Sequence, residues 1–212
     1  IGGSITEGSG AGDYKKRWAT MVVDGFFKKN YPNKNVIERN AAIGGTYSNY
    51  GMIRIKRDLL PESEATPDVV FVEYAVNDSD FGGASYVSSY MESIVRQLLL
   101  LEKIPVIIFV YTTKSDAAAV EKTIKLHKAV ADKYGIYQIN LHDYIWKGVN
   151  ENRYVWKANE PSSLTGDGVH PNAAGHKVYA DRVIELLEKD KEIAFKKLDP
   201  YTEPYYDSVY GE

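Results

Sequence analysis

Apolar and polar positions alternate along this chain in two different rhythms. Short, nearly continuous apolar runs are typical of strands that a sheet buries on both faces, whereas apolar positions every three to four residues are typical of amphipathic helices. The apolar runs predict strands at 35–39, 68–74, 105–111 and 136–140. The longer stretches predict helices at 14–30, 48–60, 85–102, 116–134 and 172–189. This alternation of helices and strands predicts an α/β domain with a mainly parallel sheet.

Length and composition narrow the class of protein. The 212 residues suit one domain with a substantial core. Hydrophobic residues make up 44% and charged residues 26%, which is ordinary for a soluble globular protein, and the net charge of -3 gives no reason to expect a nucleic-acid partner. No apolar run approaches the roughly 20 residues that a membrane-spanning helix needs. The absence of cysteine excludes disulfides, thiolate zinc sites and cysteine nucleophiles.

Four polar segments, three of which contain glycine, follow or flank the predicted strands. In a doubly wound sheet, ligands bind outside the carboxyl ends of the strands. Four segments are expected to meet at that edge, namely GGSITEG at 2–8, NAAIGGT at 40–46, AVND at 75–78 and DGVHPN at 167–172. Together they hold a serine hydroxyl, backbone donors beside glycines, an amide, a carboxylate and an imidazole.

That set of groups predicts acyl transfer. A serine is a poor nucleophile until an imidazole accepts its proton, and the imidazole needs a carboxylate to fix its tautomer. Ser4, His170 and Asp167 supply these three groups, and the D-x-x-H spacing lets the last two come from one short turn. Backbone N–H groups and Asn77 can supply the donors that a tetrahedral oxyanion needs.

The four segments resemble the four blocks that define the SGNH/GDSL hydrolases, which hold Ser, Gly, Asn and His in that chain order. The resemblance implies that Ser4 is the nucleophile and that Asp167 and His170 complete its triad. It also implies an oxyanion hole made by the N–H of Ser4, the N–H of Gly45 and the amide of Asn77. The implied fold is a flavodoxin-like three-layer α/β/α sandwich with no metal or organic cofactor.

Two positions depart from the family pattern. Gly3 replaces the acidic residue that usually precedes the nucleophile, and Ala75 stands where the third block usually has a glycine. Neither position carries a chemical step, so the departures bear on subfamily and substrate rather than on the reaction.

The expected reaction is hydrolysis of a small acyl ester, with O-acetyl groups on a carbohydrate as the favoured substrate. Tyr47, Tyr50, Tyr154 and Trp156 are expected near the mouth of the site. The loop at 147–168 is expected to fold over this mouth and to place Trp156 or Tyr154 at the rim as a sugar-stacking surface. The sequences GGSIT and GDGVHPN also resemble those of bacterial carbohydrate-esterase-like members. A secreted bacterial protein is therefore favoured.

Two other functions stay open at this point. One is a lysophospholipase or thioesterase that acts on longer acyl chains, and the other is a non-catalytic glycan-binding module on the same scaffold. The partner is accordingly a small-molecule or polysaccharide ester, and the oligomeric state is open.

Several other polar residues have simpler explanations. His127 falls in the middle of a predicted helix and is expected on the surface. His142 and Asp143 are expected to cap the helix that follows the last strand. Glu73 ends a buried strand, where a hydrogen-bonded structural carboxylate is expected and a contact with the site is the alternative.

One hydrolase domain is expected over residues 1–192, followed by a C-terminal extension or linker at 193–212. The nucleophile turn follows Ile1 directly, so the strand that feeds it is expected before Ile1, between the strands at 35–39 and 68–74. Without that strand two sheet edges would lie open. The polypeptide is therefore expected to extend upstream of Ile1 by at least one strand.

Overall fold

Three parallel strands form the centre of the domain. A computed structural model of the chain describes residues 1–61 and 65–204. The strands lie side by side in the order β1 (Val69–Val72), β2 (Val106–Tyr111) and β3 (Tyr137–Asn140). All three form within the apolar runs at which the sequence predicts them.

Helices connect the strands and cover them. The longer helices are α3 (Ser48–Asp58), α5 (Tyr86–Leu99), α6 (Ala117–Tyr134), α7 (Leu141–Asn150) and α8 (Ala173–Lys189). The short helical segments are α1 (Ser4–Glu7), η1 (Tyr14–Lys16), α2 (Trp18–Val22), η2 (Val23–Lys28), α4 (Ala75–Asp78), η3 (Ser79–Phe81) and α9 (Lys191–Ala194). The helix predicted over 14–30 is thus divided into a 3-10 turn, an α-helical turn and a π-helical segment.

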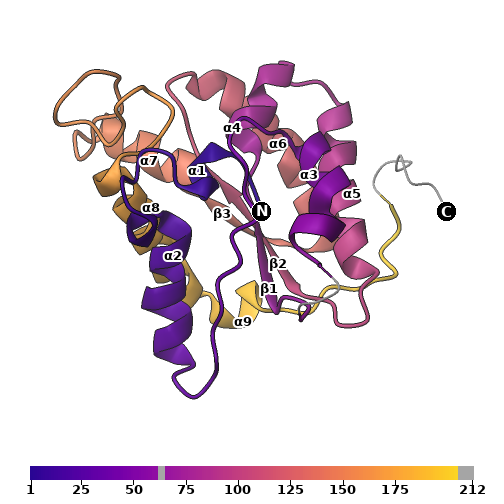
Figure 1. Ribbon diagram of the computed structural model, residues 1–212. Coiled ribbons are helices and arrows are strands. Elements are labelled where there is room, and N and C mark those ends of the chain that lie inside the picture. The colour runs from indigo at the N-terminus through magenta and orange to yellow at the C-terminus, as the bar shows by residue number, and fades with distance from the viewer. Residues whose placement is uncertain (62–64, 205–212) are drawn as a thin grey trace.

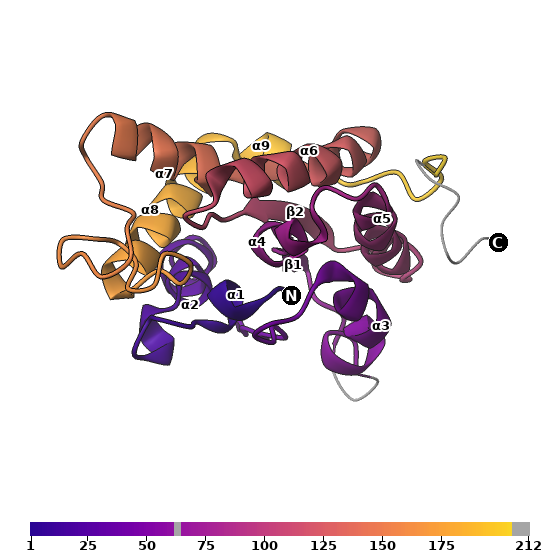
Figure 2. The ribbon, with the colours of Figure 1, turned by 90° about the horizontal axis from the view of Figure 1, so that it is seen from above.

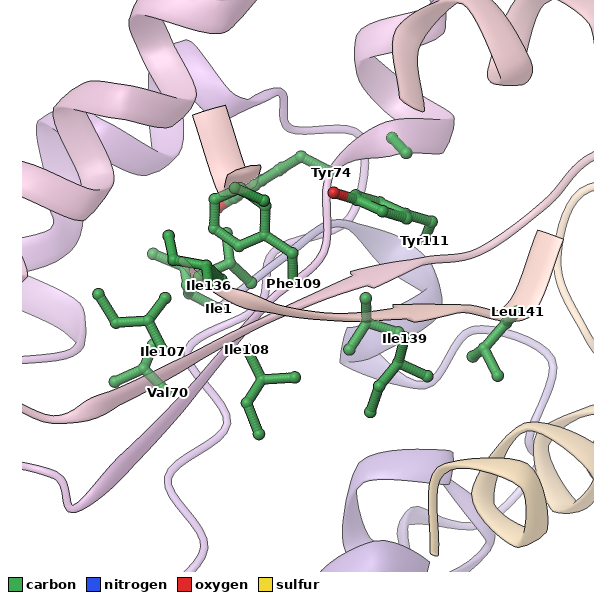
Figure 3. Close-up of a cluster of buried hydrophobic side chains, with 14 of the residues drawn as sticks. Ile1, Val70, Tyr74, Ile107, Ile108, Phe109, Tyr111, Ile136, Ile139 and Leu141 are labelled. Carbon is green, nitrogen blue, oxygen red and sulfur yellow. The ribbon is translucent and has the colours of Figure 1, made fainter. Parts of the chain in front are cut away.

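The helices form two layers with the strands between them. In both Figure 1 and Figure 2, α2 and α8 lie on one side of the strands, and α3 and α5 lie on the other. Successive strand residues point to opposite layers, as Ile108 and Phe109 do in Figure 3. On the α2 side, the rings of Trp18 and Phe71 meet edge to face with centroids 5.9 Å apart. The predicted three-layer α/β/α sandwich with a parallel sheet is confirmed.

No strand forms at 35–39, so that prediction is wrong. The segment has only two adjacent apolar residues, and one of them, Ile37, is 74% exposed. Residues 34–40 and β1 instead line the same groove of about 850 Å³. A short segment with few apolar side chains gains little from strand geometry unless a partner strand satisfies its backbone groups.

Ile1 lies beside β1, next to the nucleophile turn. Its amino group donates to the carbonyl of Phe71 at 2.9 Å, and its own carbonyl accepts from the Glu73 N–H at 3.1 Å. Gly2 forms a parallel bridge with Glu73. Ile1 is therefore buried rather than free in solvent, and the expectation of an upstream strand stays a prediction.

The chain continues to contact the domain after the boundary predicted at residue 192. Ala194 is buried, and the ring of Phe195 stacks on that of Phe26 with centroids 5.9 Å apart. The boundary itself stays a prediction, and residues 205–212 of the expected extension lie outside the described residues. No helix within 1–61 or 65–204 is long and apolar enough to cross a membrane.

Candidate active site

Ser4 stands at the start of a single helical turn. Gly3 is extended and precedes α1, and its N–H donates to the Glu73 carbonyl at 3.3 Å, which fixes the turn to the end of β1. Gly8 ends α1 in the left-handed region at φ 112°. The N–H groups of a helix start have no partner within the helix, so this turn presents both the hydroxyl and the N–H of Ser4 at the sheet edge.

Ser4, His170 and Asp167 form a hydrogen-bonded chain. The Oγ of Ser4 lies 2.8 Å from Nε2 of His170, and Nδ1 of His170 lies 2.6 Å from Oδ2 of Asp167. The side chains of His170 and Asp167 are 32% and 55% exposed. The carboxylate thus fixes the imidazole tautomer that leaves Nε2 free to accept the serine proton.

Asp167 is held in its charged form. Its Oδ1 accepts from the backbone N–H groups of Val169 and His170, each at 2.8 Å. Partial burial acts to raise the pKa of Asp167, but hydrogen bonds from the His170 ring and from these two N–H groups outweigh it and hold the pKa well below its usual range. The carboxylate therefore stays ionised at any pH at which an esterase is assayed.

The turn that carries His170 is anchored mainly through the carbonyl of Gly168. Gly168 has φ +85°, a conformation that favours glycine, and a Cβ there would lie 2.5 Å from Ser115 Oγ. Its carbonyl accepts from the Ser115 N–H at 2.7 Å and from Nε1 of Trp156 at 3.2 Å. Thr165 Oγ1 also donates to the His170 carbonyl at 2.8 Å. These bonds hold the imidazole in place although its loop is at the surface.

Asn77 and the loop of Gly45 lie next to the nucleophile turn, at Gly3. A Cβ on Gly3 would lie 2.2 Å from Oδ1 of Asn77 and 3.5 Å from the carbonyl of Thr46, so Gly3 permits this close approach. The neighbouring N–H of Gly44 donates to Glu7 Oε2 at 3.0 Å, which ties the loop to α1. The structure thus brings Ser4, Gly45 and Asn77 to the same side of the sheet edge.

Glu73 lies beneath the nucleophile turn. It is 1% exposed and accepts hydrogen bonds from Thr6 Oγ1 at 2.9 Å and from Thr112 Oγ1 at 2.8 Å. Burial raises the pKa of its carboxyl, and the two hydroxyl donors act against that rise. Because Thr6 belongs to α1, the carboxylate supports the turn that carries Ser4 without contacting Ser4 itself.

The loop at 147–168 is predicted to place Trp156 or Tyr154 at the rim; for Trp156 this is wrong, and for Tyr154 it stays a prediction. Trp156 is only 5% exposed, and its ring stacks on Tyr179 with centroids 6.0 Å apart. Its indole N–H donates to the Gly168 carbonyl. It anchors the histidine loop and offers no open face to a sugar. Tyr154 is half-buried, with its hydroxyl 3.1 Å from that of Tyr144.

A different set of rings lies next to the site, which we call the aromatic patch. It consists of Tyr47, Phe81, Tyr86 and Tyr90, whose neighbouring centroids are 4.8 to 6.4 Å apart. Its charged neighbour Asp80 pairs with Lys114 at 2.8 Å. Of these rings only Tyr47 was expected at the mouth. Phe81 lies only four residues after Asn77, and this proximity in the sequence could have indicated that the other rings lie near the site.

His127 is buried, so its predicted surface position is also wrong. It is 0% exposed, and its Nε2 lies 2.9 Å from Oδ2 of Asp78, the residue after Asn77. No group of three or more His, Asp or Glu residues in the described ranges is placed to hold a metal ion.

Comparison with known proteins identifies the family of this chain and several similar structures. Residues 1–178 match the sequence profile of the GDSL-like lipase/acylhydrolase family. No curated protein matches the sequence. A solved two-domain esterase active on acetylated mannans, co-crystallised with mannopentaose, is 28% identical with a TM-score of 0.83. That similarity covers 100% of this chain and 53% of the esterase, so the chain spans about half of its length.

Two more distant structures share the fold. A member of the lipolytic G-D-S-L family from Veillonella parvula is 19% identical, with a TM-score of 0.65, over 89% of this chain and 96% of its own. A carbohydrate acetylesterase from Sinorhizobium meliloti is 16% identical, with a TM-score of 0.61, over 89% of this chain and 96% of its own.

Proposed function

The chain belongs to the GDSL-like lipase/acylhydrolase family, and from this premise we propose that it hydrolyses small acyl esters, with O-acetyl groups on a carbohydrate as its substrate. The predicted family and enzyme class, a serine ester hydrolase of the GDSL/SGNH type, are thereby confirmed. The observation that carries the proposal is the chain of hydrogen bonds from Ser4 through His170 to Asp167.

The proposed reaction proceeds through an acyl-enzyme. Nε2 of His170 takes the proton of Ser4 as Oγ attacks the acyl carbon, and the resulting imidazolium is stabilised by Asp167. The same proton then passes to the departing alcohol oxygen, which leaves the acyl group on Ser4. A water molecule next gives its proton to His170 and attacks the acyl carbon. The carboxylic acid departs, and the proton returns to Ser4.

The oxyanion formed in both halves of the reaction needs donors that are already in place. We assign this role to the N–H groups of Ser4 and Gly45 and to the side-chain amide of Asn77. Support comes from the close approach of Asn77 and the Gly44–Thr46 loop to the nucleophile turn.

Three observations favour an acetylated carbohydrate. The 28% identical solved esterase is active on acetylated mannans. The aromatic patch begins at Tyr47, directly after the loop of Gly45, and aromatic faces suit the apolar face of a sugar ring. The Asp80–Lys114 pair beside it supplies polar groups for hydroxyls.

Longer acyl chains receive less support. The groove of about 850 Å³ between residues 34–40 and β1 is lined by neither Ser4 nor His170. This groove therefore does not continue the site as an acyl channel would and lends no support to a long-chain substrate.

The test is turnover of p-nitrophenyl acetate, butyrate and octanoate, followed by acetate release from acetylated mannan and acetylated xylan. We expect the acetate ester to be the best of the three synthetic substrates and acetate to be released from a polysaccharide. Ser4→Ala is the control for contaminating activity. A protein that binds these glycans but turns over no ester would instead be a binding module.

A matched pair of variants tests the sugar-binding role of the aromatic patch. Tyr86 is 46% exposed within it, and Tyr201 is 88% exposed in the C-terminal segment. We expect Tyr86→Ala to lower acetate release from polysaccharide more than turnover of p-nitrophenyl acetate, and Tyr201→Ala to change neither. An equal loss on both substrates would remove the patch from the substrate-binding site.

A further inference from the structure

A second Asp–His pair lies buried behind the site. Asp78 is the last residue of α4 and directly follows Asn77, and His127 lies on α6. Both residues are 0% exposed, and Nε2 of His127 lies 2.9 Å from Oδ2 of Asp78. The proposed reaction does not use either side chain, because neither reaches Ser4 or solvent.

The carboxylate of Asp78 joins three elements of the fold. Its Oδ1 accepts from the N–H of Ser48, the first residue of α3, at 2.9 Å. Its Oδ2 binds His127 on α6, and its own backbone belongs to α4. A charge at a helix start is favourable because the first N–H groups of a helix have no partner within it. A single side chain therefore fixes the start of α3 against α4.

Two of the joined elements, α4 and the start of α3, carry or directly follow the proposed oxyanion donors. Asn77 is the neighbour of Asp78, and Gly45 lies three residues before Ser48. A change in the distance between Asp78 and Ser48 would therefore displace the start of α3, and with it the adjoining end of the Gly45 loop, relative to Asn77.

The imidazole of His127 makes one hydrogen bond among the described residues. Among the residues that the structure describes, Nδ1 has no hydrogen-bond partner, so the hydrogen bond to Asp78 is the polar contact of this imidazole. The ring of Tyr111 packs beside it with centroids 6.2 Å apart. A buried carboxylate is costly unless its oxygens are paired, and His127 supplies the second partner that keeps Asp78 in place.

We propose that Asp78 and His127 are positioning residues for the oxyanion hole: the carboxylate sets the distance between the Gly45 loop and Asn77, and the imidazole holds the carboxylate. The inference rests on the proposed function and adds to it a part of the fold that never contacts substrate. Oxyanion donors act through preorganisation, and a displacement of about 1 Å can lower a rate by as much as about 10²-fold.

The test is a double-mutant cycle on p-nitrophenyl acetate. His127→Leu removes the donor to Asp78, and we expect it to lower kcat by about 10-fold to 10²-fold with little change in KM. Asn77→Ala alone should lower kcat by about 10²-fold to 10³-fold. In the Asn77→Ala background, His127→Leu should cost much less than it does alone, because the donor it positions is already gone. Equal losses in both backgrounds would overturn the proposal.

Two further variants separate positioning from general destabilisation. His127→Gln returns an amide donor toward Asp78 and should recover most of kcat. Tyr134→Phe is the matched control, because it removes a hydrogen bond of 2.6 Å to the buried Glu92 from the same helix, α6, away from the site. We expect Tyr134→Phe to lower the melting temperature but not kcat. A comparable kcat loss in Tyr134→Phe would overturn the proposal.

A structural readout keeps the inference independent of catalysis. If His127→Leu does not fold, the same cycle is run with Asp78→Asn, which keeps an oxygen for the Ser48 N–H. In a crystal structure of whichever variant folds, we expect Asn77 and the Gly45 loop to have shifted relative to Ser4, with α3 and α6 retained. Unmoved donors would contradict the positioning role even in a protein without esterase activity, whereas absent turnover in the wild type contradicts only the proposed function.

Discussion

The molecule holds two Asp–His pairs of the same chemistry in opposite surroundings. Asp167 and His170 lie at the surface, with a contact of 2.6 Å, and the imidazole turns its other nitrogen to Ser4. Asp78 and His127 lie in the interior, with a contact of 2.9 Å, and contact only groups of the protein. The two pairs have the same residue types and differ in their access to solvent and to Ser4. Only the surface pair can transfer a proton to or from Ser4, whereas the buried pair can only position neighbouring parts of the fold.

The same difference predicts opposite energetic signatures. An exposed ion pair contributes little to stability, since water solvates both partners when they separate. Removal of one partner from a buried pair leaves the other without compensation and is strongly destabilising. The surface pair should therefore affect activity with little change in stability, whereas the buried pair should affect stability strongly in addition to its proposed effect on kcat.

The largest expected effect is on the surface pair. His170→Ala removes the group that accepts the Ser4 proton, so kcat/KM for p-nitrophenyl acetate should fall by at least about 10⁴-fold. The urea midpoint of unfolding should change little, because the side chain is 32% exposed. Retention of more than a tenth of the activity would mean that another base serves Ser4.

The next effect concerns the buried pair. Asp78→Ala leaves His127 and the Ser48 N–H without their acceptor, and the free energy of unfolding should fall by about 3–5 kcal/mol. Asp167→Ala is the control, with a smaller expected loss of about 1–2 kcal/mol, because it removes the acceptor of two backbone N–H groups that water can reach. Urea denaturation measures both, and similar losses for the two variants would contradict the distinction between the pairs.

A smaller effect is expected where the two regions meet, at the contact of Gly3 with Asn77. A Cβ at Gly3 would stand 2.2 Å from Asn77 Oδ1, and the easiest adjustment is a movement of that side chain. Gly3→Ala should therefore lower kcat by about 10²-fold, near the loss of one oxyanion donor, with little change in stability. Gly166→Ala, whose Cβ would meet nothing within 4 Å, is the control. Full activity of Gly3→Ala would show that Asn77 need not lie there.

The smallest effect involves a histidine that is buried without a carboxylate. Nδ1 of His176 accepts from the Trp18 N–H at 3.3 Å, and Nε2 lies 3.0 Å from the Ser9 carbonyl, so only the neutral ring satisfies both contacts. Burial is the main cause that lowers the pKa of His176 below its ordinary value of 6.5. Its contribution to stability is thus present above about pH 6.5 and is lost as the pH falls through the lowered pKa.

Chemical denaturation between pH 7 and pH 5 measures this contribution. The free energy of unfolding should fall with decreasing pH by at most about 1.4 kcal/mol per pH unit for this group, and His176→Gln should flatten the decrease. An unchanged slope in the variant would assign the acid sensitivity to other groups.

The sequence alone was sufficient where a short motif and its chemistry coincide. Ser4, Asp167 and His170 lie within blocks of seven and six residues whose geometry depends on local turns, and the structure brings them into one hydrogen-bonded chain. Their catalytic roles stay predictions. The strands β1 and β2 were predictable for a similar reason, because continuous apolar runs allow few other placements.

Errors arose where burial depends on distant parts of the chain. Among the described residues no strand pairs with 35–39, although Val36 and Ile37 suit a strand. Trp156 is covered by Tyr179 of a later helix. His127 differs, because its position was readable. Val120, Ile124 and Tyr134 lie on its face of α6, and their spacing places His127 in the same buried stripe.

The anchoring of the histidine loop has a consequence for how this enzyme can be altered. Val155 and Leu164 close the base of the loop with a backbone hydrogen bond of 2.9 Å, and Trp156 fastens that base to Gly168. Asn159 still belongs to the anchored part, because its N–H donates to the Gly166 carbonyl at 3.0 Å, and the exposed residues 160–162 form the tip beyond it. Changes in length or composition at such a tip cost little, since loop-closure entropy grows slowly with length. The tip is therefore a natural place to graft new recognition segments without disturbing the imidazole a few residues away.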